Sequence, residues 1–279
     1  MTNEIADPLV EFPDVSATTD LVHIAATQAG AVTVMMNRPA KRNAFDSDLI
    51  SALEEAFTTL KSADGVRVVF VRGAGGTFSA GADLAWMRAA ADRTESDNRE
   101  DAYEMARMLK ALHDLPALTV ALVEGAAFGG GVGLAAACDL AVATADTRFS
   151  LSEVKLGLIP ATISPYVIQA VGPRQARGLF ATGREFDAAY AEQIGLLTEV
   201  VADAAALQAA AHRIARDIMA CAPGAVAASK RLVDDVAGRP IHHDLMELTA
   251  HRIAATRVGE EGQEGVRAFL EHRKPGWAL

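Results

Sequence analysis

The sequence predicts an α/β core that carries a helical C-terminal extension. β-Branched apolar runs alternate with amphipathic helical segments up to about residue 205, one strand–turn–helix unit occurs twice, and the remaining chain has a helical pattern almost throughout. No low-complexity linker divides the 279 residues. We therefore expect an N-terminal tail (1–17), a core (18–205) and a helical domain (206–279).

The composition narrows the classes of function. The net charge is −10 and 51% of the residues are hydrophobic, which allows a large buried core and argues against nucleic acid or an anionic membrane surface as a partner. The N-terminus lacks the pattern of a signal peptide, and no run is long enough to span a membrane. We expect a cytoplasmic protein in which Cys138 and Cys221 are buried, reduced thiols.

The first half of the chain shows clear local signals. Runs 21–28 and 31–37, separated by Ala29 and Gly30, predict a β-hairpin. A helix over 48–63, capped by Asp46 or Ser47, leads to a buried strand. This buried strand is expected at 66–73. A long helix with a solvated polar face follows at 93–115, and the next strand is expected at 118–125.

Helical patterns dominate the second half. Three helical segments are expected at 164–172, 173–183 and 187–197. Beyond them, Leu207, Ala211, Ile214 and Ile218 recur at helical spacing, which indicates a stripe that faces the core or a subunit interface. His242, His243 and His251 lie in a polar helical region without matching ligands, so we expect solvated histidines and no metal site.

The internal repeat carries the strongest functional signal. Segments 68–84 and 119–134 both run from a strand, through VRGA or VEGA, into a glycine-containing turn and a helix. Small residues let a ligand approach the backbone, and the first N–H groups of a helix have no partner within it. Two such turns on adjacent strands could direct two N–H donors at one developing oxyanion. Alternatively, the glycines only permit tight packing between strand and helix.

Four segments together resemble a known family. FSAGADLAWM (78–87), GAAFGGGVGLAAACDLAVA (125–143), FSLSEVKLGLIP (149–160) and AFLEHRKPGW (268–277) are similar to the crotonase, or enoyl-CoA hydratase/isomerase, superfamily. The resemblance implies a spiral of ββα units with a C-terminal helical trimerisation domain, often assembled as a dimer of trimers. It also implies an acyl-CoA thioester as the ligand, with coenzyme A as part of the substrate and no separate cofactor.

The resemblance assigns ligand contacts to two segments. The thioester carbonyl oxygen would lie between the backbone N–H groups of Ala82 and Gly130. The loop that contains this first donor would contact coenzyme A, and Lys41 or Arg42 would lie near its phosphates, although a solvated turn is an alternative for that basic pair. The loop residues are Ala80, Gly81, Ala82, Asp83 and Leu84.

The chain departs from two-carboxylate hydratases of that family at two places. Gly133 stands where they carry a glutamate and is a candidate for the substrate pocket, so Glu153 is the one remaining acid/base carboxylate that the resemblance implies. Without the resemblance, Glu153 would be assigned to the surface, paired with a nearby lysine. ATISPYV (161–167) replaces a glycine-rich segment, which makes Thr162, Ser164 and Tyr166 candidates for polar contacts with the substrate.

One carboxylate allows two reactions. It could deprotonate water and protonate the α-carbon of a 2-enoyl thioester, or it could move a proton during the isomerisation of a 3-enoyl to a 2-enoyl thioester. The motifs most resemble a bacterial branch assigned to 3-methylglutaconyl-CoA hydration. We rank hydration first and isomerisation second, ahead of a non-catalytic acyl-CoA-binding protein; RNA binding is the weakest alternative because of the acidic charge.

Overall fold

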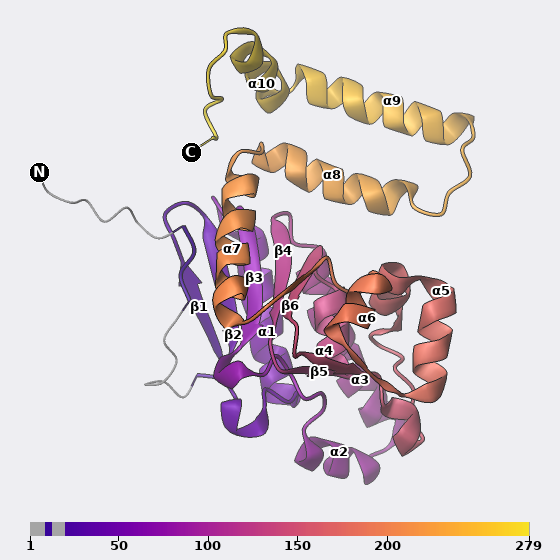
Figure 1. Cartoon of the computed structure of the whole chain (residues 1–279). Helices are drawn as coiled ribbons and strands as arrows, with labels where there is room; N and C mark the ends of the chain where they lie inside the picture. The colour runs from indigo at the N-terminus through magenta and orange to yellow at the C-terminus, as the bar shows by residue number, and fades with distance from the viewer. Residues whose placement is uncertain (1–8, 13–19, 279) are drawn as a thin grey trace, which may run out of the picture.

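The computed structural model describes residues 9–12 and 20–278. A six-stranded sheet has the order β1-β2-β3-β4-β6-β9, in which only the β1–β2 pair is antiparallel, and a smaller sheet has the order β5-β7-β8 (Figure 1). The strands are β1 (Val22–Ala26), β2 (Ala31–Met36), β3 (Val68–Gly73), β4 (Leu118–Val123), β5 (Ala126–Phe128), β6 (Leu140–Thr144), β7 (Arg148–Ser150), β8 (Glu185–Asp187) and β9 (Glu199–Val201).

Helices cover the sheet and extend beyond it. The α-helices are α1 (Ser47–Ser62), α2 (Leu84–Ala91), α3 (Glu95–His113), α4 (Gly130–Ala136), α5 (Ser164–Thr182), α6 (Ala188–Gln193), α7 (Ala204–Met219), α8 (Pro223–Val236), α9 (His243–Val258) and α10 (Glu260–Leu270). Short 3-10 helices are η1 (Pro39–Lys41), η2 (Ala74–Gly76) and η3 (Glu153–Leu156). α5 contains a break at Gly172, which matches the two helical segments expected there.

The central strands are buried on both faces. In β3, Val69 and Val71 belong to one apolar cluster, with the inner faces of α1 and α3, whereas Val68 and Phe70 belong to a second cluster, with α7. Side chains alternate between the two faces of a strand, so a strand between two helical layers has a continuous apolar sequence. Both predicted central strands and the predicted hairpin are confirmed.

Capping residues fix where the first helices begin. The Asp46 carboxylate accepts from the Leu49 N–H at 3.0 Å, so Asp46 is the cap of α1 and not Ser47. At α3, Thr94 and Asp97 form a reciprocal capping box. These local bonds explain why the predicted boundaries of both helices are close to the observed ones.

α7 belongs to the core. Its stripe, with Leu207, Ala211 and Ile214 buried, packs on the sheet beside β3, β4 and β6. Of the two interpretations of the stripe, core packing is therefore confirmed for these three residues. The boundary expected near residue 205 falls in front of a core helix, and the helices that leave the core are α8, α9 and α10 (Figure 1).

The start of the described chain also packs on this face. Val10 is buried in the cluster with α7, and Thr33 Oγ1 donates to the Glu11 carbonyl at 2.6 Å. Residues 1–8 and 13–17 of the expected tail lie outside the described residues. Residues 9–12 therefore behave as part of the core and not as a free tail.

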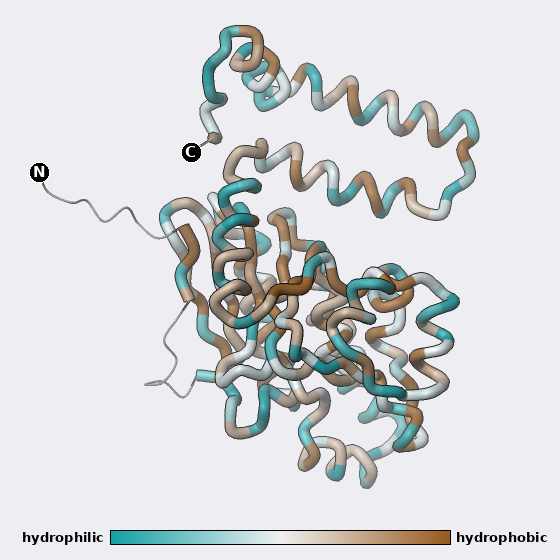
Figure 2. Tube along the Cα trace, in the orientation of Figure 1, coloured by the Kyte–Doolittle hydropathy of each residue, from teal (hydrophilic) through white to brown (hydrophobic). Residues whose placement is uncertain are grey.

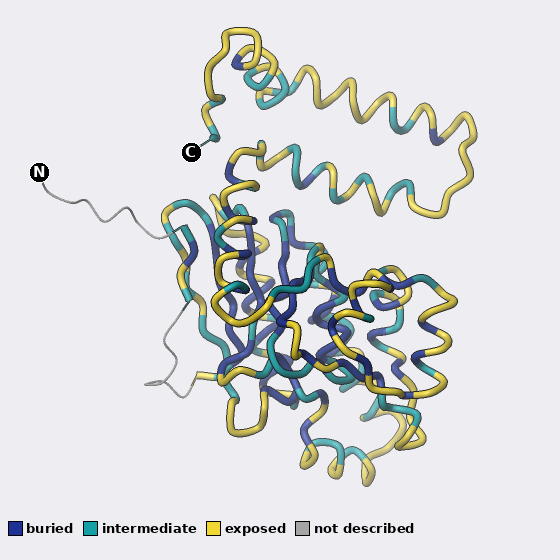
Figure 3. Tube along the Cα trace, in the orientation of Figure 1, coloured by how far each residue is buried: buried dark blue, intermediate teal, exposed yellow. Residues whose placement is uncertain are grey.

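The helices α8–α10 form an arm that projects from the core. Most of α9 and α10 is exposed (Figure 3), and the arm carries scattered hydrophobic residues (Figure 2). The Arg67 guanidinium fixes the base of the arm by donating to the carbonyls of Ile218, Cys221 and Trp277 at 3.2, 2.6 and 3.4 Å. Exposed large hydrophobic residues on the arm include Ile241, Met246, Ile253, Val258, Val266, Phe269 and Leu270.

The cysteines differ from each other. Burial raises the pKa of the Cys138 thiol, which donates to the Leu134 carbonyl, whereas Cys221 is exposed. The expectation of buried thiols is therefore wrong for Cys221, because it lies at the exposed α7–α8 junction where the chain leaves the core. Both are free cysteines. In the described part of the chain, no helix combines the length and apolarity that a membrane span requires.

Candidate active site

The two repeated turns lie side by side after the neighbouring strands β3 and β4. The Ser79 N–H donates to the Ala126 carbonyl and the Ser79 carbonyl accepts from the Phe128 N–H, both at 3.0 Å. Ser79 Oγ also donates to the Asn43 carbonyl at 2.8 Å. Because one residue of the first turn bonds to two residues of the second, the two turns are direct neighbours.

The first turn leaves the Ala82 N–H unpaired. Phe45 bonds on either side of it, because its N–H donates to the Gly81 carbonyl at 2.7 Å and its carbonyl accepts from the Asp83 N–H at 2.8 Å. This parallel bridge directs the Ala82 N–H away from Phe45. Within residues 9–12 and 20–278, the Ala82 N–H donates no hydrogen bond.

The second turn presents the Gly130 N–H in the same way. Gly129 has a φ of +47° and donates its N–H to the Ser150 carbonyl at 2.8 Å. Gly130 is the first residue of α4, where backbone N–H groups have no partner inside the helix. Its N–H makes no hydrogen bond within the described chain. Two unpaired donors therefore occur on the two turns that the sequence indicates.

Close packing explains another of these glycines. A Cβ on Gly131 would lie 2.9 Å from the Ser79 carbonyl oxygen, too close for any side chain. Close packing, one of the two functions that the sequence left open, is therefore confirmed for Gly131. Gly131 permits the two turns to meet, and Gly129 adopts a positive φ immediately before the unpaired Gly130 N–H.

Glu153 lies beside the second turn. It begins η3, and its Oε1 is 3.1 Å from the position that a Cβ on Gly129 would occupy. Its Oε2 is buried and has no hydrogen-bond partner among the described residues. Burial raises the pKa of the Glu153 carboxyl above its ordinary value. The alternative of a surface carboxylate paired with lysine is therefore wrong, since the described chain shows no such pair.

Position 133 is closed by a side chain that the sequence did not indicate. A Cβ on Gly133 would lie 2.5 Å from Ile163 Cβ and closer still to its Cγ2. Ile163 is buried, so an apolar group fills the direction in which a carboxylate at 133 would project. Gly133 is therefore a packing position and does not contribute to an open substrate pocket.

The polar residues around Ile163 do not converge on Glu153. Ser164 Oγ donates to the Ala161 carbonyl at 2.8 Å, at the start of α5. The Tyr166 ring contacts the His113 ring, with centroids 5.5 Å apart, and burial raises the pKa of its hydroxyl. Thr162 is half-buried. Within the described residues, none of these hydroxyls hydrogen-bonds to Glu153, and the Ser164 hydroxyl is directed to another partner.

Asp83 organises the loop that was expected to contact coenzyme A. Its carboxylate is 4% exposed and accepts from the Ala85 N–H at 2.8 Å, as the cap of α2. It also pairs with Lys41 at 3.2 Å and with Arg38 at 3.3 Å. The Ala85 bond, followed by the Lys41 bond, holds the pKa of Asp83 below its ordinary value. The Asp83 side chain is therefore committed to positioning the loop.

Three of the other expected coenzyme A contacts remain available to a ligand, whereas Gly81 is buried and both its backbone groups are hydrogen-bonded. Leu84 is 78% exposed, and Arg42 is exposed at the end of η1, where its φ is +52°. Lys41 is exposed on one side while it pairs with Asp83. The Ala80 N–H donates to the Arg42 carbonyl at 2.9 Å, which ties the basic turn to the loop that follows Ser79.

Asn43 is a structural residue of the site that sequence reasoning missed. Its buried amide nitrogen donates to the carbonyls of Ala74 and Thr77 at 2.9 and 2.6 Å, and its Oδ1 accepts from the Arg38 N–H at 2.8 Å. Its φ is +52°, a conformation that asparagine tolerates better than most residues. The signal in the sequence that could have indicated this residue is an asparagine that directly follows two basic residues.

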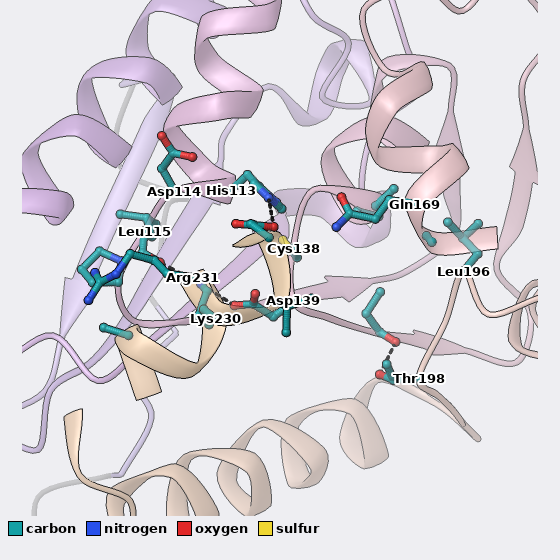
Figure 4. A pocket seen from close by; sticks show the side chains of 18 of the residues that line it. His113, Asp114, Leu115, Cys138, Asp139, Gln169, Leu196, Thr198, Lys230 and Arg231 are labelled. Carbon is teal, nitrogen blue, oxygen red and sulfur yellow. Dashed lines mark hydrogen bonds and ion pairs between the residues drawn. The ribbon is translucent and has the colours of Figure 1, made fainter. Parts of the chain in front are cut away.

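A cavity of about 620 Å³ lies elsewhere, between α8 and the core (Figure 4). It opens near the amino ends of β4, β6 and β9, opposite the edge that carries Glu153. Lys230 Nζ spans it, bonding to Asp139 at 2.6 Å and to the Leu115 carbonyl at 2.7 Å. None of the site residues expected from the sequence lines this cavity.

The three histidines expected to be solvated are exposed. His242, His243 and His251 lie at or within α9, on the projecting arm. Across the described residues, no group of three or more histidine, cysteine, aspartate or glutamate side chains is arranged to hold a metal ion.

The geometry defines a class of site: two unpaired backbone donors on paired glycine-containing turns, with one buried carboxylate beside them. A family model for enoyl-CoA hydratase/isomerase matches residues 26–278. The chain therefore belongs to the enoyl-CoA hydratase/isomerase family and is an enzyme of that family, with the crotonase fold.

The chain is similar in sequence to several known proteins over most of their length. An enoyl-CoA hydratase of Alternaria alternata, AKT6-1, is 34% identical over 249 residues, which cover 88% of this chain and 80% of that protein. The mitochondrial enoyl-CoA hydratase domain-containing protein 2 of Bos taurus is 34% identical over 263 residues, covering 90% and 86%. The crystal structure of an enoyl-CoA hydratase from Shewanella pealeana superimposes with a TM-score of 0.89, at 38% identity, covering 92% and 96%.

Proposed function

We propose that this enzyme hydrates the 2,3 double bond of an enoyl-CoA thioester, with Glu153 as its acid/base group. The observation that carries the proposal is the Glu153 carboxylate: its Oε1 lies beside Gly129, the residue before Gly130, and its buried Oε2 has no partner among the described residues. The names of the Alternaria and Shewanella relatives support hydration. An acyl-CoA thioester is the substrate class of the family.

The proposed reaction uses the site residues in sequence. Glu153 removes a proton from water, the oxygen of that water bonds to C3, and the electrons of the 2,3 double bond shift toward the thioester carbonyl. The N–H groups of Ala82 and Gly130 bind the negative oxygen that develops, a contribution worth about 2.7–4 kcal/mol for one such donor. Glu153 then returns the proton to C2, so that water is added and no other reactant is required.

Isomerisation of a 3-enoyl thioester is the second candidate. Ile163 fills the space beside Gly133, so a second carboxylate does not stand there. An isomerase needs only one group that removes a proton from C2 and returns it to C4. The same Glu153 could perform that transfer if water is excluded from the bound substrate.

A turnover panel tests the proposal. The full-length enzyme is supplied separately with crotonyl-CoA, with 3-methylglutaconyl-CoA, the branched substrate that the motifs suggest, and with a 3-enoyl-CoA, and the products are separated by chromatography. Hydrated products from either 2-enoyl substrate support the proposal. Turnover of the 3-enoyl substrate alone, to an unhydrated 2-enoyl product, supports isomerisation. No turnover of any substrate favours a non-catalytic acyl-CoA-binding role.

We also propose that the arm forms a homotrimer, or a dimer of trimers. Large apolar side chains such as Ile253 and Phe269 are exposed on α9 and α10, more than a solvated arm requires. Light scattering at micromolar concentration is expected to give three or six times the mass of 29.3 kDa. A stable monomer would rule this assembly out.

A further inference from the structure

A second buried polar atom near the site has no partner. Among the described residues, four buried side-chain nitrogen or oxygen atoms lack a hydrogen bond: His23 Nε2, Arg72 Nε, Trp86 Nε1 and Glu153 Oε2. His23 Nε2 lies 3.8 Å from Asp20, and the Arg72 guanidinium bonds to Glu124 at 2.5 Å through another nitrogen. Trp86 and Glu153 are therefore the two groups whose function no protein contact explains.

Trp86 belongs to the same segment as the Ala82 donor. It lies in the first turn of α2, and its backbone N–H donates to Asp83 Oδ1 at 3.3 Å. Its side chain packs against the apolar cluster that contains Phe45, whereas Leu84 in the same turn faces solvent. Because Arg38 and Lys41 hold Asp83, the indole and the Ala82 N–H are positioned by one anchored segment.

The chemistry of the indole restricts what could satisfy it. A tryptophan N–H is a donor only, and in buried positions it usually finds an acceptor. An unsatisfied buried donor costs the folded protein its desolvation penalty, so it calls for an explanation such as a bound ligand. Two other unpaired groups, the Gly130 N–H on the second turn and Glu153 Oε2 at the start of η3, are the proposed contacts of an acyl-CoA thioester, a ligand that is rich in acceptor oxygens.

We propose that the Trp86 Nε1–H donates a hydrogen bond to an acceptor oxygen of the bound acyl-CoA and thereby contributes to substrate specificity. The inference rests on the proposed function. The acceptor comes from one of two sources: a carboxylate at the far end of the acyl group, as in a dicarboxylic acyl thioester, or an oxygen that every acyl-CoA shares, such as an amide carbonyl of the pantetheine arm. The two sources predict different patterns of selectivity.

Binding of saturated analogues tests the contact without requiring turnover. Butyryl-CoA and glutaryl-CoA are titrated into wild type, Trp86→Phe and Trp277→Phe, with calorimetry as the readout. Trp86→Phe keeps an aromatic ring and removes the N–H. Trp277→Phe is the matched control, because its indole donates to the Ala220 carbonyl at 3.3 Å, at the base of the arm.

A hydrogen bond from the indole predicts a loss of about tenfold or more in affinity in Trp86→Phe. Loss for glutaryl-CoA alone identifies the distal carboxylate, and equal loss for both analogues identifies an oxygen that both thioesters share, such as a pantetheine carbonyl. Unchanged dissociation constants for both analogues in a folded Trp86→Phe protein would overturn the proposal. If wild type binds the analogues but hydrates no enoyl-CoA, the proposed function fails while the Trp86 contact is still tested.

A second measurement avoids changing Trp86. The chain has two tryptophans, so ¹⁵N-tryptophan labelling of Trp277→Phe leaves one indole N–H signal in the NMR spectrum. A new acceptor should move that proton signal downfield on addition of butyryl-CoA or glutaryl-CoA. A signal that stays in place at saturation with both analogues contradicts the contact even if Trp86→Phe does not fold.

Discussion

The Glu153 Oε1 atom lies 3.1 Å from the point where a Cβ on Gly129 would stand. Gly129 also adopts a φ of +47°, and its N–H is fixed by the Ser150 carbonyl. The position therefore excludes a side chain for two independent reasons: backbone conformation and the nearby carboxylate. Gly129 therefore lies next to the carboxylate of Glu153, the proposed acid/base group, and directly precedes Gly130, the proposed oxyanion donor.

Gly129→Ala is expected to reduce turnover by tenfold or more, because the new methyl group displaces the Glu153 carboxylate. A positive φ for a residue with a side chain costs about 1–3 kcal/mol, so some stability is lost as well. Gly238→Ala is the matched control: its φ is +70° and its Cβ would meet no atom within 4 Å. Thermal unfolding and turnover are measured for both. Equal activity in the two variants would show that the Gly129–Glu153 contact is irrelevant.

Glu153→Gln is expected to stabilise the fold at neutral pH. The pKa of Glu153 is raised by burial, so the folded state binds this proton more tightly than the unfolded state. Below the ordinary carboxyl pKa, Glu153 is protonated in both states and does not lower the free energy of unfolding. As pH rises through the raised pKa, the buried carboxylate becomes charged and its full destabilising effect develops. The melting temperature of the variant should exceed that of wild type at pH 7–8 and approach it near pH 4. A constant difference would contradict the shifted pKa.

Gly133→Glu alone is expected to destabilise the protein without creating a second acid. The new Cβ would overlap Ile163, and overpacking of a core costs about 1–3 kcal/mol. Adding Ile163→Gly removes the overlapping atoms. We expect the double variant to yield more hydrated product from a 3-enoyl-CoA than Gly133→Glu alone. A well-folded, fully active single variant would show that Ile163 moves aside.

A comparison of Gly130→Pro with Gly130→Ala separates the loss of the Gly130 N–H from the effect of an added side chain. Both variants place a Cβ near Met105 Cε and Phe45 Cδ2, which lie 3.0 and 3.1 Å from that position, but only proline removes the N–H. Proline is tolerated at the first residue of a helix. Turnover of Gly130→Pro should be about 10²-fold or more below that of Gly130→Ala. Similar rates in two folded variants would exclude the Gly130 N–H as a donor.

Local signals explain most of what the sequence predicted. The hairpin, α1, α3 and the repeated turns depend on Gly30, on caps such as Asp46 and on periodicity, all of which act within a few residues. The short strands of the β5-β7-β8 sheet were not predicted. Each has three residues, too few for a pattern, and forms only because distant segments meet.

From the sequence, the candidate site could be predicted only as two backbone donors and one carboxylate, and the functions of these groups stay predictions. The polar contacts of the site could not be predicted, because they depend on tertiary packing. Asp83 turns inward to cap α2 and bind Arg38, and Ile163 closes the space beside Gly133. Nothing in the local sequence around Gly133 or Trp86 indicates which distant side chain will face it.

The most direct test of the account is the activity of Glu153→Gln toward the better of the two 2-enoyl substrates, crotonyl-CoA or 3-methylglutaconyl-CoA, measured beside its affinity for butyryl-CoA. The variant keeps the size of the side chain and removes its titratable group, so kcat is expected to fall by roughly 10²- to 10⁴-fold while the dissociation constant changes little. A folded variant that retains wild-type kcat, or one that loses butyryl-CoA binding along with activity, would contradict Glu153 as the acid/base group.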